Sequence, residues 1–304
     1  MTSWGALAAL AGLALFAVLL SMLPPPRGRR AAVLVAMLVI VSVGWRLRPD
    51  PPPPPPEGLR IVMLDFGQGD GILLQTKTGA VLVDQGPPEA GVAGQLRKLG
   101  VRRLAALVVT HPHRDHVGGA TSMVDDFPVG FVLDPLEPTD GSDERAFLRE
   151  ARERGVPVVP ARIGHSYRLG KLRLRVLWPD GPGVRGDDPH EHGVILLATY
   201  GDFDALFTGD SESPVTLPLR PPPVELLKVA HHGSSDAGLD DLLRLVRPRI
   251  ALISVGAGND YGHPAPATLA ALERFGGLSV YRTDEDGRVT IESDGKRFSV
   301  RTER

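Results

Sequence analysis

Four side chains able to bind a metal stand within six residues in the middle of the chain: His111, His113, Asp115 and His116. They follow the apolar run 104–109, which predicts a buried strand. Residues two apart in an extended loop point the same way, so His111 and His113 can converge on one ion while the other pair turns toward a second. Neutral imidazole and carboxylate groups suit Zn²⁺, Mn²⁺ or Fe. The cluster therefore predicts a fold that brings further ligands to the end of one strand.

Cysteine is absent from the chain, which excludes a thiolate metal site, a disulfide framework and a catalytic thiol. A metal must therefore be held by histidine and carboxylate side chains. The formal net charge of −2 at pH 7 excludes a strongly basic nucleic-acid coat protein and an acidic solvating tail. Residues 57–304 carry 29 Lys and Arg against 35 Asp and Glu, and this net charge of −6 argues against tight, non-specific binding to duplex DNA.

The N-terminal end of the chain differs in composition from the rest. Residues 4–23 form a run without a charge that is long enough to span a bilayer as a helix, and residues 31–45 form a second, shorter apolar run. The arginines between the two runs favour a cytoplasmic loop. We therefore predict that residues 1–48 form two transmembrane helices, a hairpin with both ends outside the cell. A cleaved signal peptide is disfavoured, because the first run is long and no basic residue precedes it.

The remaining residues predict a linker and one further domain. Residues 49–57 contain an unbroken proline run, which favours a stiff extended spacer. In residues 58–304, short β-prone runs alternate with segments of helical spacing, for example the strand at 59–64 and the helix at 91–99. This alternation predicts a layered α/β domain. With the hairpin in the cell membrane, the domain is expected on the extracytoplasmic side.

Several motifs together resemble a known family. The His-x-His-x-Asp-His pattern after a strand is similar to the signature of the metallo-β-lactamase superfamily. Thr208-Gly209-Asp210 resembles the motif that supplies a metal-bridging carboxylate in that superfamily. Five more segments, in the same order, resemble the C-terminal hydrolase domain of ComEC-type competence proteins, which are DNA-uptake channels: 64–70, 83–86, 228–234, 261–264 and 281–287.

The resemblance implies an α/β fold of the metallo-β-lactamase type, an αββα sandwich, here preceded by the membrane hairpin. It implies a hydrolase with two divalent metal ions, zinc or manganese, that activate water. It favours a phosphodiesterase or nuclease-like activity, with DNA or another phosphodiester as the substrate. ComEC-type proteins carry a long polytopic channel before this domain, whereas this chain offers at most two spans. The resemblance therefore implies a membrane-anchored hydrolase with a separate uptake channel as its partner.

The resemblance also implies a set of metal ligands. Where the competence proteins have Asn and Ser before a strand, this chain has a histidine pair, of which His192 is preferred because it stands closer to the strand; His190 stays open as the alternative. Of the pair His231 and His232, one is expected to bind metal, and His231 is preferred. Asp84 is expected to bind metal or to orient a ligand histidine. The predicted metal ligands are His111, His113, Asp115, His116, His192, Asp210 and His231.

Three residues receive catalytic roles. Asp115 is assigned to the reacting centre as well as to metal binding. His263 and Lys228 are assigned to hold the negative group of the substrate, with a plain turn and a strand-end cap as their respective structural alternatives. The general acid cannot be identified from the sequence.

Two other functions are compatible with the same fold. One is a non-catalytic scaffold in a membrane assembly, which would be expected to lack metal ligands. The other is an envelope-directed esterase of the phosphorylcholine type, which would differ only in its substrate. The nearly complete ligand set favours an enzyme over a scaffold.

Overall fold

The computed structural model describes residues 11, 12, 14, 18, 29–46, 51–183 and 188–304. The chain divides into two compact units, 1–52 and 53–304, which are described separately. The first unit contains helix α2 (Arg29–Arg46), which covers the second predicted span. The first predicted span, at 4–23, lies almost entirely outside the described residues. None of the helices in the described part of the chain is long and apolar enough to cross a membrane, so the predicted hairpin is not confirmed.

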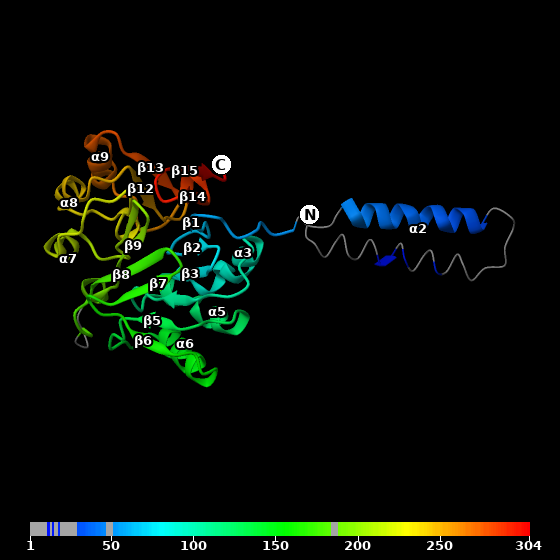
Figure 1. Ribbon diagram of the computed structural model, residues 1–304, viewed down its shortest axis with the longest axis horizontal. Helices are drawn as coiled ribbons and strands as arrows, with labels where there is room; N and C mark the ends of the chain where they lie inside the picture. Colours follow the sequence, from blue (N-terminus) through cyan, green and yellow to red (C-terminus); the bar gives the residue numbers. More distant parts are fainter. Residues whose placement is uncertain (1–10, 13, 15–17, 19–28, 47–50, 184–187) are drawn as a thin grey trace. The chain divides into compact units, whose positions relative to one another are not determined.

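The second unit is built on two sheets (Figure 1). The first sheet has eight strands in the order β15-β14-β1-β2-β3-β4-β5-β6, of which β3 to β6 run parallel and the others pair antiparallel. Its strands are β15 (Phe298–Thr302), β14 (Val289–Ser293), β1 (Leu59–Met63), β2 (Ile72–Thr76), β3 (Gly79–Val83), β4 (Ala106–Val108), β5 (Val132–Asp134) and β6 (Val158–Pro160).

The second sheet has seven strands in the order β13-β12-β11-β10-β9-β8-β7. Strands β10 to β13 run parallel, and β7, β8 and β9 continue the sheet antiparallel. Its strands are β13 (Ser279–Arg282), β12 (Ile250–Ile253), β11 (Leu226–Lys228), β10 (Phe203–Phe207), β9 (Ile195–Tyr200), β8 (Leu172–Trp178) and β7 (Ser166–Leu169).

Helices cover the outer faces of both sheets (Figure 1). The first sheet packs against α3, α5 and α6, and the second against α8 and α9. Short helices and 3-10 turns occupy the loops between strands. The helices of this unit are α3 (Val92–Lys98), α4 (Arg114–Val117), α5 (Ala120–Asp126), α6 (Ser142–Glu153), α7 (Ser213–Thr216), α8 (Leu239–Val246), α9 (Pro266–Phe275) and α10 (Thr283–Asp286), with 3-10 turns η1 (Pro88–Ala90), η2 (Pro189–His192), η3 (Leu217–Leu219) and η4 (His231–Gly233).

Both faces of the central strands are apolar, because each sheet is covered on both sides. On β1, Ile61 and Met63 belong to the core between the two sheets, whereas Val62 belongs to the core under the helices of the first sheet. Such alternation follows from the two-residue period of a strand. A third core lies between the second sheet and its helices. Three stacked cores give the predicted αββα sandwich.

The parallel part of each sheet directs its carboxyl ends to one edge, where ligands bind in open α/β sheets. The loop after β4 carries the histidine cluster, and the loops after β10, β11 and β12 carry Asp210, His231 and His263. Strand β9 runs antiparallel to β10, with Leu196 opposite Phe207. Strand β9 therefore begins at the same edge, and the segment before it ends there. The topology thus brings five loops from distant parts of the sequence together.

Candidate metal centre

The loop after β4 is anchored from below by Asp84, at the end of β3. One carboxylate oxygen of Asp84 accepts the backbone N–H of Thr110 at 2.8 Å, and the other accepts the Thr110 hydroxyl at 2.7 Å. The second oxygen also lies 2.8 Å from Nδ1 of His116, which leaves Nε2 of that ring to face the centre. Asp84 thus fixes the orientation of the His116 ring, which agrees with the second of the two roles expected for it.

Asp210 lies in the middle of the converging loops. Its Oδ2 atom is 3.2 Å from Nε2 of His116, and four other imidazoles place Nε2 within 3.9 Å of the same oxygen. The carboxylate is almost completely buried. Burial alone would raise the pKa of Asp210, but the charges of His116, His232 and Lys228 hold it well below its ordinary value. The four other imidazoles belong to His111, His190, His231 and His232.

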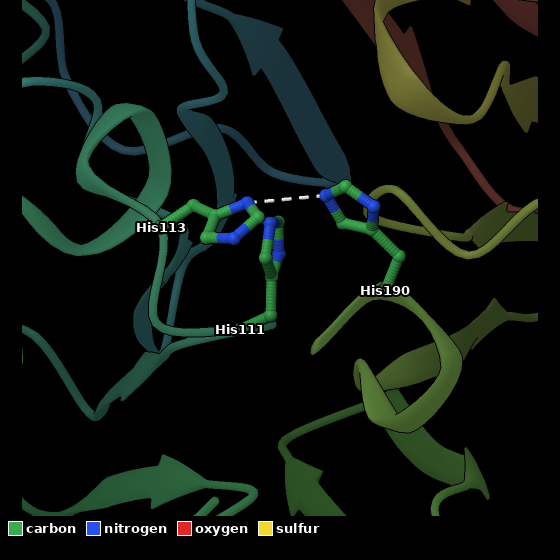
Figure 2. Close-up of side chains that lie close together, drawn as sticks. All are labelled: His111, His113 and His190. Carbon is green, nitrogen blue, oxygen red and sulfur yellow. Dashed lines mark hydrogen bonds between the residues drawn. The ribbon is translucent and has the colours of Figure 1, made fainter. Parts of the chain in front are cut away.

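One group of potential ligands combines the first loop with η2. His111, His113 and His190 place one ring nitrogen each within reach of a single ion (Figure 2). Nε2 of His190 lies 3.1 Å from Nδ1 of His113, and the ring centroids of His111 and His190 are 5.1 Å apart. Burial, together with the neighbouring His116, lowers the pKa of His111 well below its ordinary value, so its imidazole is neutral, as a metal ligand requires.

A second group combines the same loop with η4. Asp115, His116 and His232 converge, with Oδ2 of Asp115 3.2 Å from Nε2 of His232 and 3.8 Å from Nε2 of His116. Nδ1 of His232 lies 2.8 Å from the backbone oxygen of Ser254, a contact that fixes the ring and directs Nε2 inward. His232 thus lies where it can bind a metal together with Asp115 and His116, whereas the sequence analysis preferred His231.

His231 also faces the centre, from the opposite side of η4. It forms a group with His190 and Asp210, and its Nδ1 atom lies 3.1 Å from a carboxylate oxygen of Glu212. His231 and His232 are both in the left-handed region, with φ of 50° and 53°. Backbone conformations of this kind cost free energy in non-glycine residues and are common at functional sites. The strain turns two consecutive side chains toward one centre, so both histidines of the pair, and not only the preferred His231, are in a position to bind metal.

The residues present fit a divalent metal ion. Among the described residues, Nε2 of His111, Nε2 of His116 and Oδ1 of Asp210 are buried without a hydrogen-bond partner. Buried polar atoms in this state are costly, and a cation that accepts their lone pairs removes the cost. The donors are nitrogen and oxygen only, a set that suits Zn²⁺, Mn²⁺ or Fe.

The structure brings His190, rather than the preferred His192, next to His111 and His113. His190 is the residue of η2 that faces His113 and His111, because Asp188 caps the turn through the backbone N–H of His190 and sets the direction of its side chain. His192 lies instead against Gly183, where an added Cβ would be 2.8 Å from its ring. Distance along the chain from β9 was therefore a poor guide to which histidine reaches the centre.

The predicted substrate contact of Lys228 is also corrected. This side chain is fully buried beneath the centre. Its Nζ atom donates a hydrogen bond to the backbone oxygen of Gly209 at 2.7 Å, pairs with Asp70, and lies 3.6 Å from Oδ1 of Asp210. Burial would lower the pKa of Lys228, but the two carboxylates hold it above its ordinary value. Lys228 therefore positions Asp210 and cannot reach a substrate.

His263 lies at the rim of the centre, where the sequence placed it. Its ring is half-buried and 5.7 Å from that of His231, in an edge-to-face arrangement. The backbone is held by Asn259, whose Oδ1 atom accepts the N–H of His263 at 3.1 Å. His263 is therefore positioned next to the metal-binding residues without belonging to either of the two main groups described above.

The structure also places His190, His232 and Asp70 at the centre. His190 had been left open as the alternative to His192, and His232 was the less favoured member of its pair, so the duplicated histidines were the signal for both; Asp70 was not among the predicted ligands. Asp70 is buried and belongs to a group with Asp84 and His116. Its position in one of the segments similar to competence proteins was the only sequence signal for it.

Comparison with known proteins extends these observations. Residues 64–257 match the model of the family described as "Metallo-beta-lactamase superfamily". The chain is 29% identical to ComE operon protein 3 of Bacillus subtilis (strain 168), over 75% of this chain and 32% of that protein. It is 27% identical to competence protein ComA of Neisseria gonorrhoeae, over 90% of this chain and 37% of that protein. The chain thus spans about a third of the length of these curated relatives.

Solved structures share the same architecture. CmlA, a diiron β-hydroxylase from Streptomyces venezuelae, superposes with a TM-score of 0.55 at 16% sequence identity, over 78% of this chain and 55% of that one. This likeness concerns the fold alone. The family match covers more than half of the chain and includes the histidine cluster and Asp210. The chain therefore belongs to the metallo-β-lactamase superfamily, with a metal-dependent hydrolase fold, and is related to competence proteins.

Proposed function

We propose that residues 58–304 form a dinuclear metal-dependent phosphodiesterase. One observation carries the proposal: five imidazole nitrogens lie within 3.9 Å of one oxygen of the buried Asp210, and the potential ligand groups here include His111-His113-His190 and Asp115-His116-His232. A single structural ion needs three or four ligands. The larger number of donors, together with the central position of Asp210, supports two ions that share this carboxylate.

The two groups assign ligands to two ions, zinc or manganese. His111, His113 and His190 would hold the first, and Asp115, His116 and His232 the second, with Asp210 between them and His231 beside it. Divalent ions in such a site make water nucleophilic at neutral pH and offset the negative charge that develops on the substrate.

The protein's own contribution is to orient these ligands and to hold the substrate. Asp84 and the backbone oxygen of Ser254 fix two ligand rings, and Lys228 fixes Asp210 from below. We assign Asp115 a second role, as acceptor of a hydrogen bond from the attacking water. His263 donates a hydrogen bond to a phosphate oxygen of the substrate from the rim of the centre.

Nucleic acid is the substrate class with the best support. The support is the relation to competence proteins and the five competence-like segments, all of which lie in or around the loops of the centre or at the end of the chain. Residues 57–304 carry a net charge of −6, so their general attraction to phosphates is weak. Affinity for nucleic acid must therefore come from specific contacts.

Metal analysis and one chromogenic substrate test the proposal. The purified chain, reconstituted with Zn²⁺ or Mn²⁺, is expected to hold close to two equivalents and to hydrolyse bis-p-nitrophenyl phosphate. Treatment with a chelator should abolish the hydrolysis, and restored metal should recover it. A chain that binds two equivalents but cleaves only carboxylic esters would contradict the phosphodiester assignment, and one that binds no metal would contradict the dinuclear centre.

Attachment to the cell membrane, with the hydrolase domain outside, is a separate part of the proposal. It rests on the apolar runs at 4–23 and 31–45, on the arginines between them and on the relation to competence proteins. A separate uptake channel is the partner proposed on the same grounds. Alkaline phosphatase fused after Arg304 should be active if the domain is exported, whereas a fluorescent protein at the same position that is bright in cells without phosphatase activity would place the domain in the cytoplasm.

A further inference from the structure

One large aromatic side chain in a loop beside the metal centre is exposed. Tyr261 has 70% of its surface exposed, and in the described part of residues 53–304 the only other large apolar side chain exposed to a similar degree is Ile163, at 51%. Single exposed apolar side chains are ordinary on protein surfaces, so what distinguishes Tyr261 is its position. Tyr261 follows β12, in the loop that carries His263 to the rim of the centre.

The loop that carries Tyr261 is held in place. Oδ1 of Asn259 accepts the backbone N–H of Tyr261 at 3.1 Å, and Nδ2 donates to the backbone oxygens of Gly256 at 3.0 Å and of His263 at 2.6 Å. The end of the loop is tied to η4, because the N–H of Ala265 donates to the backbone oxygen of Gly233 at 2.8 Å. An exposed ring on a fixed backbone loses little conformational entropy when it binds a ligand.

The ring of Tyr261 continues a line of rings that begins at the metal-binding residues. His231 and His263 have ring centroids 5.7 Å apart, and Tyr261 follows His263 at 6.1 Å with an angle of 15° between the two planes. The two contacts therefore connect a histidine at the centre to an exposed aromatic ring. A phosphate held at the centre would bring the rest of its nucleotide close to this ring.

We propose that Tyr261 stacks on an unpaired nucleobase of a single-stranded nucleic acid and so selects single strands over duplexes. The proposal rests on the phosphodiesterase function proposed above and names its substrate class. A base within a duplex has both faces covered by its neighbours, whereas an unpaired base can offer a face to a protein ring. Because residues 57–304 carry a net charge of −6, attraction to phosphates is weak and stacking contributes a large share of the affinity.

The test measures binding separately from hydrolysis. The metal-loaded full chain is titrated against a fluorescein-labelled oligothymidylate of about twelve nucleotides with phosphorothioate linkages, which resist cleavage. Tyr261→Ala is expected to raise Kd about ten-fold or more, and Tyr261→Phe or Tyr261→Trp to stay within about two-fold of the wild type. Ile163→Ser is the matched control, because it removes the other exposed apolar side chain and should leave Kd unchanged.

An abasic nucleotide, moved along the oligothymidylate one position at a time, identifies the partner of the ring. At one position, the abasic nucleotide should raise the Kd of the wild type by about the same factor as Tyr261→Ala does. At that position, it should not raise the Kd of the Tyr261→Ala variant any further. Equal Kd values for wild type and Tyr261→Ala, additive effects at every position, or equal affinity for single strand and duplex would each overturn the proposal. Failure to hydrolyse bis-p-nitrophenyl phosphate would instead overturn the phosphodiesterase function, and the binding results would still decide the role of Tyr261.

Discussion

The two halves of the domain supply the metal centre in different ways. The first half provides His111, His113, Asp115 and His116 from one loop, whose shape is fixed by contacts to the neighbouring strand β3. The second half provides its donors from separate loops, before β9 and after β10 and β11. A local motif keeps its geometry through a few hydrogen bonds, whereas dispersed donors depend on the register of a whole sheet. The first half is thus recognisable in the sequence, and the second half decides whether the centre forms.

The largest effect is expected where the two halves meet. Asp210→Asn removes the charge that lies between both ligand groups, so it should release both ions and lower kcat for bis-p-nitrophenyl phosphate at least about 10³-fold. Asp115→Asn removes a donor from one group only and should leave about one equivalent of metal. Elemental analysis and steady-state kinetics measure both. Equal metal loss in the two variants would show that Asp210 does not connect the halves.

The next effect concerns Lys228, which supports the dispersed half from below. Lys228→Met leaves the buried carboxylate of Asp70 without its partner, and loss of one partner of a buried ion pair costs about 3–5 kcal/mol. The matched control is Lys77→Met, which breaks the exposed pair with Glu57 and should cost less than about 1 kcal/mol. Urea unfolding gives the free energy of unfolding of each variant. Similar losses in both would mean that the buried pair has no special role.

A smaller effect separates the two histidines of η2. His190→Ala removes a ring that faces His113 at 3.1 Å and should weaken binding of the first ion by more than about 100-fold. His192→Ala should weaken it by less than about ten-fold, since its ring packs against Gly183. Competition with a fluorescent zinc chelator measures both affinities. If His192→Ala weakened metal binding more than His190→Ala does, His192 would be the ligand, as the sequence analysis preferred. Turn η2 would then present a different side chain to the centre.

The smallest expected effect is on the pH dependence of stability, and it concerns Glu144, which lies on α6 in the first half of the domain. Burial raises the pKa of Glu144 on α6 to about 8, with Asp134 and Glu137 adding to the rise. Because the folded pKa lies above the value of 4.5 for a free side chain, the folded state binds this proton more tightly. Stability contributed by the proton is therefore complete below about pH 4.5 and is lost as pH rises toward about 8, with a limiting slope of about 1.4 kcal/mol per pH unit.

Glu144→Gln should reduce this slope, leaving the smaller part that comes from Asp134, whose pKa burial raises to about 6, and should make the variant more stable than the wild type above about pH 8. Glu153→Gln, an exposed position on the same helix, is the control that should leave the slope unchanged. Thermal unfolding midpoints recorded between pH 5 and pH 8.5 measure the effect. A wild-type profile that is flat in this interval would show that Glu144 titrates normally.

Elements with a strong local pattern could be predicted from the sequence. Strand β1 (Leu59–Met63) and helix α3 (Val92–Lys98) lie within one residue, at each end, of the strand predicted at 59–64 and the helix predicted at 91–99. Helix α5 (Ala120–Asp126) was missed, because it is short and lies next to glycines that favour a loop. The αββα order was available only through the family resemblance, since strand runs do not reveal which strands pair.

The site was predictable where its contacts are local. The cluster at 111–116 and the Thr-Gly-Asp motif identified the centre, and their side chains do converge. The choice between neighbouring histidines failed because it depends on the direction in which η2 and η4 turn, and φ values of 50° and 53° are not visible in a sequence. Lys228 was misassigned because its burial follows from an ion pair with Asp70, which comes from the other sheet.

The strand order of the first sheet also determines when the sheet can be completed during synthesis. Strand β1 is the first strand of the domain to be made, and it lies between β2 and β14. Both of its edges can be paired only after β14, one of the last strands, has been made. Every residue proposed to bind metal precedes Pro264, yet the sheet that supports them is completed only when Phe298–Thr302 has been translated. A nascent chain can therefore carry all the ligands and still lack the frame that holds them. Full affinity for metal is therefore expected only once the last strand of this sheet has been made.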